Sequence, residues 1–199
     1  MNTATPYSRV GAGIQTAALG YGGATYSGPG TFATVNASEE YNGSAWTSTP
    51  NMNTARYIGA GGGTVTAALS AGGYEGPDYS SATEEYNGSA WTTVNSLPQK
   101  MNSQAFSGTQ TAGLFFGGQF PSVPSSNITN SFYYDGTNYS TAPNLGTGRR
   151  ALSGAGTQTA GLAFGGIISP QPAPVGNEAS TEEFTGETTA LNLKTLTTS

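Results

Sequence analysis

The chain has 199 residues, with six Lys and Arg against eleven Asp and Glu, and a formal net charge of −5. So few basic residues, adjacent only at Arg149-Arg150, exclude the electrostatic footprint of a protein that binds nucleic acid or an anionic membrane, and no stretch approaches the roughly 20 apolar residues that span a bilayer. Cys and His are both absent, which excludes disulfides, thiolate or imidazole metal ligands and His-dependent catalysis.

One unit recurs four times along the chain. Residues 38–47 (S-E-E-Y-N-G-S-A-W-T) and 83–92 (T-E-E-Y-N-G-S-A-W-T) are near copies, residues 131–140 form a looser copy, and residues 181–187 keep only its first half. The aromatic residue of each copy recurs at intervals of 45, 48 and 50 residues, at Tyr41, Tyr86, Tyr134 and Phe184. A glycine pair recurs upstream of each copy, at Gly22-Gly23, Gly72-Gly73, Gly117-Gly118 and Gly165-Gly166.

Each unit predicts about four short strands. A Gly/Ala-rich strand comes first, an apolar strand ends at the glycine pair, and a variable loop leads to two strands joined by a turn. Asn-Gly predicts a two-residue type I′ turn, because that turn needs positive φ at both central residues. The turn sequences are Asn42-Gly43, Asn87-Gly88, Asp135-Gly136 and, more weakly, Thr185-Gly186.

A period of 45 to 50 residues with four strands per unit is typical of a β-propeller blade. We therefore predict an all-β fold, a small propeller of four four-stranded blades in a single domain (residues 1–199). The expected blades span about residues 9–52, 56–101, 104–148 and 150–199. A closed ring is favoured, and the alternatives are an open arc completed by another subunit and a non-propeller β assembly.

Small residues suit the inner strands, which approach one another around a propeller axis. Large side chains then belong between blades. Leu and an aromatic residue alternate at period two in Leu19 with Tyr21 and in Leu162 with Phe164, which places each pair on one face of its strand. The residues predicted to have structural roles are the four glycine pairs and three aromatics that fill the space between blades, Trp46, Trp91 and Tyr139.

The order of residue types within each unit resembles that of a kelch repeat. In the second unit it runs through Arg56, Gly72-Gly73, Glu85-Tyr86, Trp91, and Pro98 with Met101. More narrowly, the units resemble those of kelch-like virion proteins of tailed marine phages such as cyanophages. In the third unit Tyr139 replaces Trp.

This resemblance implies a non-enzymatic structural or adhesive component of a phage virion, such as a fibre, tail or capsid-decoration protein. It would lie at the particle surface in several symmetric copies, docked to other virion proteins, and it could also meet the host surface. The alternative is a lectin-like binder of surface polysaccharide, located outside the cell or on a bacterial surface. Residues 1–9 lack the apolar region of a secretory signal, so we expect release by lysis or assembly inside the cell.

The loops after the glycine pairs vary most between units. They cover residues 24–37, 74–82, 119–130 and 167–180, and equivalent loops of a propeller gather on one face, where a rigid scaffold can present recognition residues. Their aromatic rings could stack on sugars. Glycan recognition, docking to a partner protein and passive connection are all compatible with these loops. The candidate binding residues are Tyr26, Phe32, Tyr74, Asp78, Tyr79 and Phe120.

Acidic pairs recur once per unit, but they predict scaffold roles rather than a pair of catalytic carboxylates. Adjacent residues of a strand point to opposite faces, whereas glycoside hydrolysis needs two carboxyl groups around one bond. Asp78 and Glu75 share a loop and are weak candidates for Ca²⁺ ligands. We expect no catalytic residue, no cofactor and no metal. The acidic pairs are Glu39-Glu40, Glu84-Glu85 and Glu182-Glu183.

Overall fold

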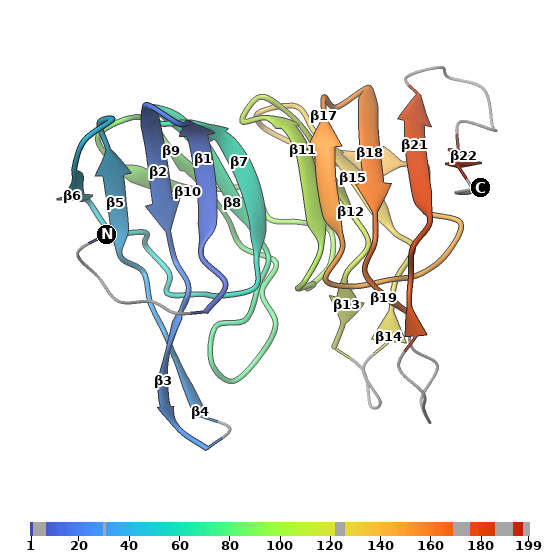
Figure 1. The fold of residues 1–199 in the computed structure, drawn as a ribbon, viewed down its shortest axis with the longest axis horizontal. Coiled ribbons are helices and arrows are strands. Elements are labelled where there is room, and N and C mark those ends of the chain that lie inside the picture. The colour runs from blue at the N-terminus through green and yellow to red at the C-terminus, as the bar shows by residue number, and fades with distance from the viewer. Residues whose placement is uncertain (2–6, 30, 122–125, 169–175, 186–192, 197–199) are drawn as a thin grey trace.

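The computed structural model describes residues 1, 7–29, 31–121, 126–168, 176–185 and 193–196 (Figure 1). These residues form short antiparallel strands joined by turns, and none of them lies in a helix. No helix within these ranges is therefore long and apolar enough to cross a membrane. The predicted all-β class is confirmed.

Four four-stranded antiparallel sheets form the body of the molecule, and we name them blades 1 to 4 in chain order. Blade 1 contains β1 (Val10–Ile14), β2 (Ala17–Tyr21), β5 (Ser38–Tyr41) and β6 (Trp46–Thr49). Blade 2 contains β7 (Ala60–Thr64), β8 (Ala67–Ala71), β9 (Thr83–Tyr86) and β10 (Trp91–Val94). Blade 3 contains β11 (Ala105–Thr109), β12 (Ala112–Phe116), β15 (Ser131–Tyr134) and β16 (Tyr139–Ala142). Blade 4 contains β17 (Ser153–Gly156), β18 (Ala160–Phe164), β21 (Thr181–Thr185) and β22 (Leu193–Leu196).

The inner strands of the blades stand around one axis, and each blade extends outward from its inner strand (Figure 1). Strand β1 packs along β7, β7 along β11, and β11 along β17. This is the predicted four-blade propeller arrangement. Within the described residues β17 does not pack along β1 in the same way, so the blades form an arc with an opening between blade 4 and blade 1. The closed ring favoured by the sequence is not formed.

The turn between the two outer strands is longer than predicted. Tyr41 pairs with Trp46, so the loop has four residues instead of two. Gly43 has φ of 94°, but Asn42 is not among the residues with positive φ, so the turn is not type I′. The Asn42 side chain determines the turn, because its Oδ1 accepts hydrogen bonds from the amides of Ser44 and Ala45 at 3.0 and 2.9 Å.

The equivalent turns of blades 2 and 3 have the same design. Asn87 Oδ1 accepts the amide of Ser89 at 2.9 Å, and Asp135 Oδ1 accepts the amides of Thr137 and Asn138 at 2.8 and 2.6 Å. These two backbone bonds, from Asn138 first and Thr137 second, lower the pKa of Asp135. Asp therefore replaces Asn because both supply the same side-chain oxygen. The turn expected in blade 4 includes Gly186, which lies outside the described residues.

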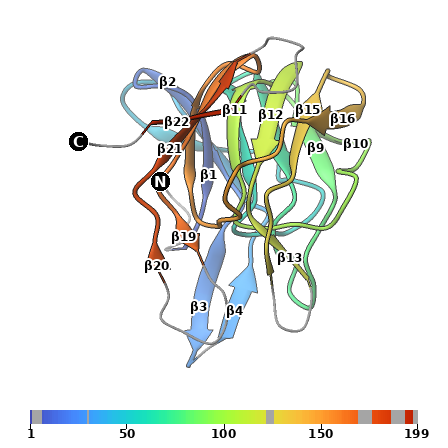
Figure 2. The same ribbon diagram turned by 90° about the vertical axis from the view of Figure 1, so that its right-hand side faces the viewer.

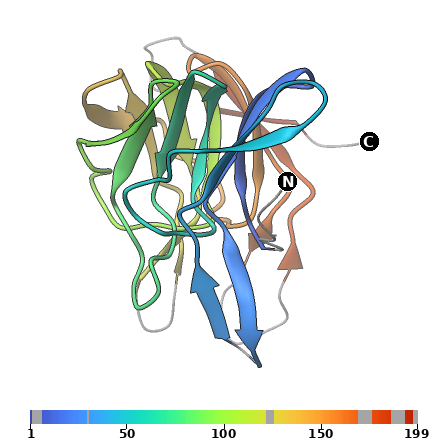
Figure 3. The same cartoon turned by 90° about the vertical axis from the view of Figure 1, so that its left-hand side faces the viewer.

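Three of the variable segments expected as loops contain two-stranded hairpins, which extend from the same end of the blades (Figures 2 and 3). The sequence reading missed them because their strands are short and lack period-two alternation. They are β3 (Ala24–Gly28) with β4 (Thr31–Thr34), β13 (Gln119–Phe120) with β14 (Ser126–Asn127), and β19 (Ile167–Ile168) with β20 (Gly176–Asn177).

The hydrophobic core lies between blades, in three clusters that correspond to the three blade interfaces. Between blades 1 and 2, Tyr21 packs on Trp91 with ring centroids 4.8 Å apart, and the Trp91 indole N–H donates to Ser38 Oγ at 3.0 Å. Between blades 2 and 3, Tyr139 shares a hydroxyl hydrogen bond of 2.8 Å with Thr83. Trp91 and Tyr139 thus occupy the wedge predicted for them. The prediction is wrong for Trp46, which is half-buried beside an open groove because no described blade precedes blade 1.

Buried ion pairs explain one half of each acidic pair. Arg9 pairs with Glu39 in blade 1, Arg56 with Glu84 in blade 2, and Arg149 with Glu182 in blade 4, all with side chains at most 9% exposed. Each guanidinium also donates to backbone carbonyls of its own blade, such as Arg149 to Ser180 at 2.9 Å. Burial lowers the pKa of Arg9 more than its interaction with Glu39 raises it.

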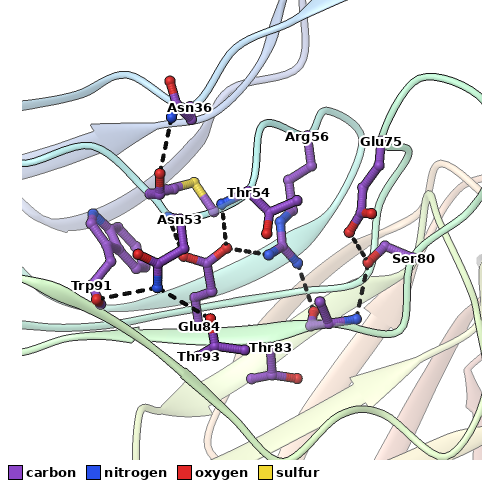
Figure 4. Close-up of polar contacts among 12 residues, drawn as sticks. Asn36, Asn53, Thr54, Arg56, Glu75, Ser80, Thr83, Glu84, Trp91 and Thr93 are labelled. Carbon is purple, nitrogen blue, oxygen red and sulfur yellow. Dashed lines mark hydrogen bonds and ion pairs between the residues drawn. The ribbon is translucent and has the colours of Figure 1, made fainter.

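Figure 4 shows this arrangement in blade 2, where Glu84 lies between Arg56 and the 53–54 segment. Its carboxylate accepts the amides of Asn53 and Thr54 at 2.7 and 3.1 Å as well as the guanidinium of Arg56. Both oxygens of this buried carboxylate are bonded to the scaffold, which fits the prediction that the acidic pairs are structural.

Blade 3 replaces the ion pair by an apolar pair. Its residues equivalent to Arg56 and Glu84 are Met101 and Phe132, which are 0% and 5% exposed and belong to one hydrophobic cluster. The residue equivalent to Asn53 is Pro98. Proline has no amide N–H, so blade 3 lacks both the carboxylate and one of the two amides that bind it in blade 2.

The glycine pairs supply backbone conformations that other residues avoid. Gly72 and Gly73 have φ of 64° and 104°, and the pairs at Gly22-Gly23, Gly117-Gly118 and Gly165-Gly166 repeat these values closely. A Cβ on Gly73 would also lie 2.8 Å from the carbonyl oxygen of Tyr57. The pair thus turns the chain out of the blade where the preceding connector passes closely.

Candidate functional site

The face that carries the hairpins is the candidate functional site, and we call it the loop face. It consists of the hairpins β3–β4, β13–β14 and β19–β20 and the loop at residues 74–82, at the lower end of the molecule in Figure 1. The equivalent variable loops were expected on one face. The register explains why they gather: Val10, the first residue of β1, pairs with Tyr21, the last residue of β2, so the chain leaves every blade beside the start of its inner strand.

Six aromatic rings form a continuous strip across the loop face of blades 1 and 2. Tyr7 contacts Phe32 with ring centroids 4.9 Å apart, and Phe32 contacts Tyr57 at 5.8 Å. Tyr57 contacts Tyr74 at 5.5 Å, and Tyr74 contacts Tyr79 at 6.0 Å. Tyr26 lies beside the first two rings, 6.4 Å from Tyr7 and 6.0 Å from Phe32. We call Tyr7, Tyr26, Phe32, Tyr57, Tyr74 and Tyr79 the aromatic strip.

One end of the aromatic strip is open to solvent. Tyr26 is 52% exposed, Tyr7 40% and Phe32 36%, and the other three rings are half-buried. Burial, and next the neighbouring phenols of Tyr74 and Tyr79, raise the pKa of Tyr57. A protonated tyrosine hydroxyl can both donate and accept hydrogen bonds.

Backbone hydrogen bonds hold the strip in place. Tyr57 and Tyr74 exchange amide-to-carbonyl bonds of 3.1 and 2.8 Å, and Tyr7 pairs with Ala24 through bonds of 3.4 and 3.0 Å. Tyr74 also bridges to Tyr79. The backbone that carries these rings is thus hydrogen-bonded before a ligand binds, which reduces the conformational entropy lost on binding.

A polar pocket of about 270 Å³ adjoins the strip at Tyr79, and its lining includes Glu75, Asp78, Ser80 and Lys100. Lys100 forms an exposed ion pair with Asp78, and Ser80 donates to Glu75. The Lys100 hydrogen bond, and next the amide of Tyr79, lower the pKa of Asp78. The pocket therefore presents both a cation and carboxylates to a polar ligand.

The two acidic residues of this loop do not form a metal centre with a third. No group of three or more His, Cys, Asp or Glu side chains that could hold a metal ion occurs in the part of the chain that the structure describes. Both carboxylates bind neighbouring side chains instead.

A second cavity lies on the propeller axis. It measures about 380 Å³ and is lined by the beginnings of all four inner strands, at residues 9–11, 59–61, 104–106 and 152–154. Six of its twelve lining residues are glycine or alanine, and the long polar side chains, Arg9 and Gln104, bind Glu39 and the carbonyl of Ala71. Such a surface offers few side chains that could orient a ligand, so the aromatic strip is the stronger candidate.

The structure brings five of the six predicted binding residues to the strip and its adjoining pocket. Tyr26, Phe32, Tyr74 and Tyr79 belong to the strip, and Asp78 lines the adjoining pocket. Phe120 lies outside the strip, on β13 of the hairpin β13–β14, which follows strand β12 of blade 3, and it is 39% exposed.

The sequence reading missed Tyr7 and Tyr57. Both lie in the connectors before inner strands, whereas all the predicted binding residues lie in the loops that follow the glycine pairs. The repeat does contain a signal, since each connector pairs with the residue just after a glycine pair, as Tyr57 does with Tyr74.

No protein-family model matches the chain, and no curated protein sequence matches it either. Among solved structures it is similar to that of YjhT, with a TM-score of 0.75 and 12% sequence identity, over 99% of this chain and 71% of that one. The fold is a four-blade propeller. At this level of identity the likeness extends to the fold alone, and the propeller's function has to be inferred from its own residues.

Proposed function

We propose that this propeller is a non-enzymatic adhesive module of a phage particle that binds surface polysaccharide through the aromatic strip. The observation that carries the proposal is the strip itself, six contacting rings of which Tyr7, Tyr26 and Phe32 are at least 36% exposed. Exposed contiguous aromatic surface on a monomer marks a binding site more often than chance packing.

Carbohydrate is the ligand class that this surface favours. Tyrosine combines a flat apolar face, on which the C–H face of a sugar can lie, with a hydroxyl that binds sugar hydroxyls. Five of the six rings are tyrosines. The polar pocket at Tyr79 adds Lys100, Asp78 and Glu75 within the same surface. The rings would thus contact the faces of a sugar chain, and the polar side chains would bind the hydroxyls at its edges.

The phage context rests on the sequence, through the resemblance of the units to kelch-like virion proteins. A scaffold role for the acidic pairs supports the non-enzymatic part of the proposal. Glu84 binds Arg56 and two amides, and Glu40 and Glu85 accept the hydroxyls of Tyr86 and Tyr134 at 2.9 and 2.8 Å. Carboxylates committed in this way are poor candidates for acid–base chemistry.

A glycan array followed by titration calorimetry tests the proposal. We expect saturable binding of a surface polysaccharide, weakened at least tenfold, about 1.4 kcal/mol, by Tyr26→Ala and by Tyr74→Ala. Phe120→Ala removes a ring that is 39% exposed and lies outside the strip, and it is the control, for which we expect a change below about twofold. Equal losses in all three variants, or no glycan bound by the wild type, would contradict the proposal.

Docking to another virion protein is the second candidate. The hairpin β3–β4 favours it, because this hairpin extends beyond the blades and carries two of the exposed rings (Figure 1). In that case the protein co-purifies with particles in several symmetric copies, Tyr26→Ala releases it from them, and isolated protein binds no glycan.

A further inference from the structure

Every blade has two unlike faces. The forward face packs on the following blade, as Leu19 and Tyr21 of blade 1 pack on Tyr86 and Trp91 of blade 2. The rear face packs on the preceding blade. At each internal interface the rear face supplies aromatic rings and side-chain donors, and the forward face supplies a leucine and the acceptors of those donors. The forward-face hydroxyls of Tyr21 and Ser107 donate in return to the carbonyls of Leu69 and Thr157.

The polar contacts repeat from one interface to the next. Tyr86 of blade 2 donates its hydroxyl to Glu40 of blade 1 at 2.9 Å, and Tyr134 of blade 3 donates to Glu85 of blade 2 at 2.8 Å. A glutamine follows the same rule on the rear faces of blades 3 and 4. It is Gln158 in blade 4, whose side-chain amide donates to the carbonyl of Tyr134 at 2.8 Å.

The forward face of blade 4 is uncovered. Leu162 and Phe164 are 36% and 39% exposed, whereas the equivalent Leu19 and Tyr21 are 1% and 0% exposed. Ser153 and Ala155 on the inner strand of the same face are exposed too, although their equivalents in blade 3, Ala105 and Ser107, are buried. Glu183 stands on this face at the position of Glu40 and Glu85.

The rear face of blade 1 is the complementary uncovered surface. A groove of about 450 Å³ runs along it beside Gly20, Gln15 and Trp46, and the Met1 side chain lies in this groove while remaining 55% exposed. Tyr41 and Trp46 are half-buried, although their equivalents Tyr86 and Trp91 are 1% and 6% exposed. The Tyr41 hydroxyl donates to the Gly43 carbonyl within its own turn.

We propose that the opening between blade 4 and blade 1 is a docking site for a partner polypeptide folded as blades of the same kind. Its first blade would place a tyrosine hydroxyl on Glu183 and cover Leu162 and Phe164 with aromatic rings. Its last blade would cover the groove beside Gly20 and Trp46 and offer backbone carbonyls to Gln15. The chain makes every one of these contacts internally, in the same register, which defines the chemistry of the partner.

A comparison of chain lengths argues against a full second copy in this opening. The four blades superpose on 71% of the chain of YjhT, and the remaining 29% of that chain corresponds to between one and two blades of the present size. A second copy brings four blades, more than this arc accommodates. The proposal concerns the blade faces and is independent of glycan binding on the loop face.

The test uses the full chain extended by its own blades. Residues 53–148, which form blades 2 and 3, are joined after Ser199 through a linker that a site-specific protease cleaves. We expect a higher melting temperature for the extended chain than for the original one. We also expect the two parts to elute together, in a 1:1 ratio, after the linker is cut, because the docked blades are then a separate polypeptide.

Substitutions on the forward face of blade 4 supply the control. Phe164→Ser and Glu183→Gln should lower the melting temperature of the extended chain and leave that of the original chain nearly unchanged. Parts that separate after cleavage, or an extended chain that melts no higher, would overturn the proposal. So would an equal loss from Phe164→Ser in the original chain, which would mean that its own blade 1 covers this face, or original chains that sediment as oligomers which Phe164→Ser disperses.

Discussion

Replacing the buried ion pair of blade 2 by an apolar pair tests whether the two charges stabilise the fold, or whether each charge is needed only to compensate the other. Arg56 and Glu84 have side chains 2% and 0% exposed, and blade 3 shows that Met and Phe can stand at the same positions. The perturbation is a double-mutant cycle of Arg56→Met and Glu84→Leu. Each single substitution leaves one buried charge without its partner, which costs about 3–5 kcal/mol.

The double variant should lose far less than the sum of the two. Apolar residues of similar volume replace a buried ion pair at little net cost, so the remaining loss comes from the amides of Asn53 and Thr54, which bind Glu84. An unsatisfied donor costs about 1–3 kcal/mol when buried, and less here because Asn53 is exposed and Thr54 only half-buried. We therefore expect a coupling free energy of about 3 kcal/mol or more, and partial recovery when Asn53→Pro, the residue of blade 3, is added.

Urea unfolding at pH 7, followed by tryptophan emission, measures the cycle, and a constant m-value shows that the denatured state has not changed. The exposed pair of Lys100 and Asp78 is the control. Lys100→Met with Asp78→Asn should leave the midpoint unchanged and show no coupling. Losses from Arg56→Met and Glu84→Leu that add within about 0.5 kcal/mol would refute the reasoning.

Two further predictions concern the blades. Gly61→Ala should destabilise by about 1–3 kcal/mol in the same assay, because its Cβ would lie 1.9 Å from a carbonyl oxygen of β8, whereas Gly11→Ala, at the equivalent position of blade 1 with its nearest atom 3.8 Å away, should cost nothing. Alkaline pH should unfold the protein, since burial raises the pKa of Tyr21, Tyr134 and Tyr139 above the ordinary value of 10.0. Above that pH the unfolded chain releases protons that the folded chain keeps, so stability falls by about 1.4 kcal/mol per pH unit for each of them. A urea midpoint that stays level from pH 10 to pH 12 would contradict this.

The sequence predicted local features well where a residue type has a single structural role. The glycine pairs occur where positive φ is required, and Trp91 lies between blades as its size requires. Asn42-Gly43 was read as a two-residue turn, because dipeptide statistics do not show that the Asn side chain can satisfy two amides of a longer loop. The hairpin β3–β4 was missed since its strands carry no alternating pattern.

The candidate site divides in the same way. Aromatic residues in the loop at residues 24–37 and in that at residues 74–82 were recognised as binding candidates from composition. Their connection into one strip depends on Tyr7 and Tyr57, whose connectors pair with the two loops across long sequence separations. Phe120 fits the same description by sequence, yet it lies on the hairpin β13–β14, outside the strip.

By itself, the sequence determined the number of blades, their strands and whether each face carries small or bulky residues. In a repeat these features follow from local spacing and periodicity. Only the tertiary structure decided how far each blade turns relative to the last. That angle arises from packing between side chains about 70 residues apart in the sequence, such as Tyr21 against Trp91 or Phe116 against Phe184, and no local pattern encodes it. The opening between blade 4 and blade 1, with Phe164 on one side and Trp46 on the other, follows from that angle.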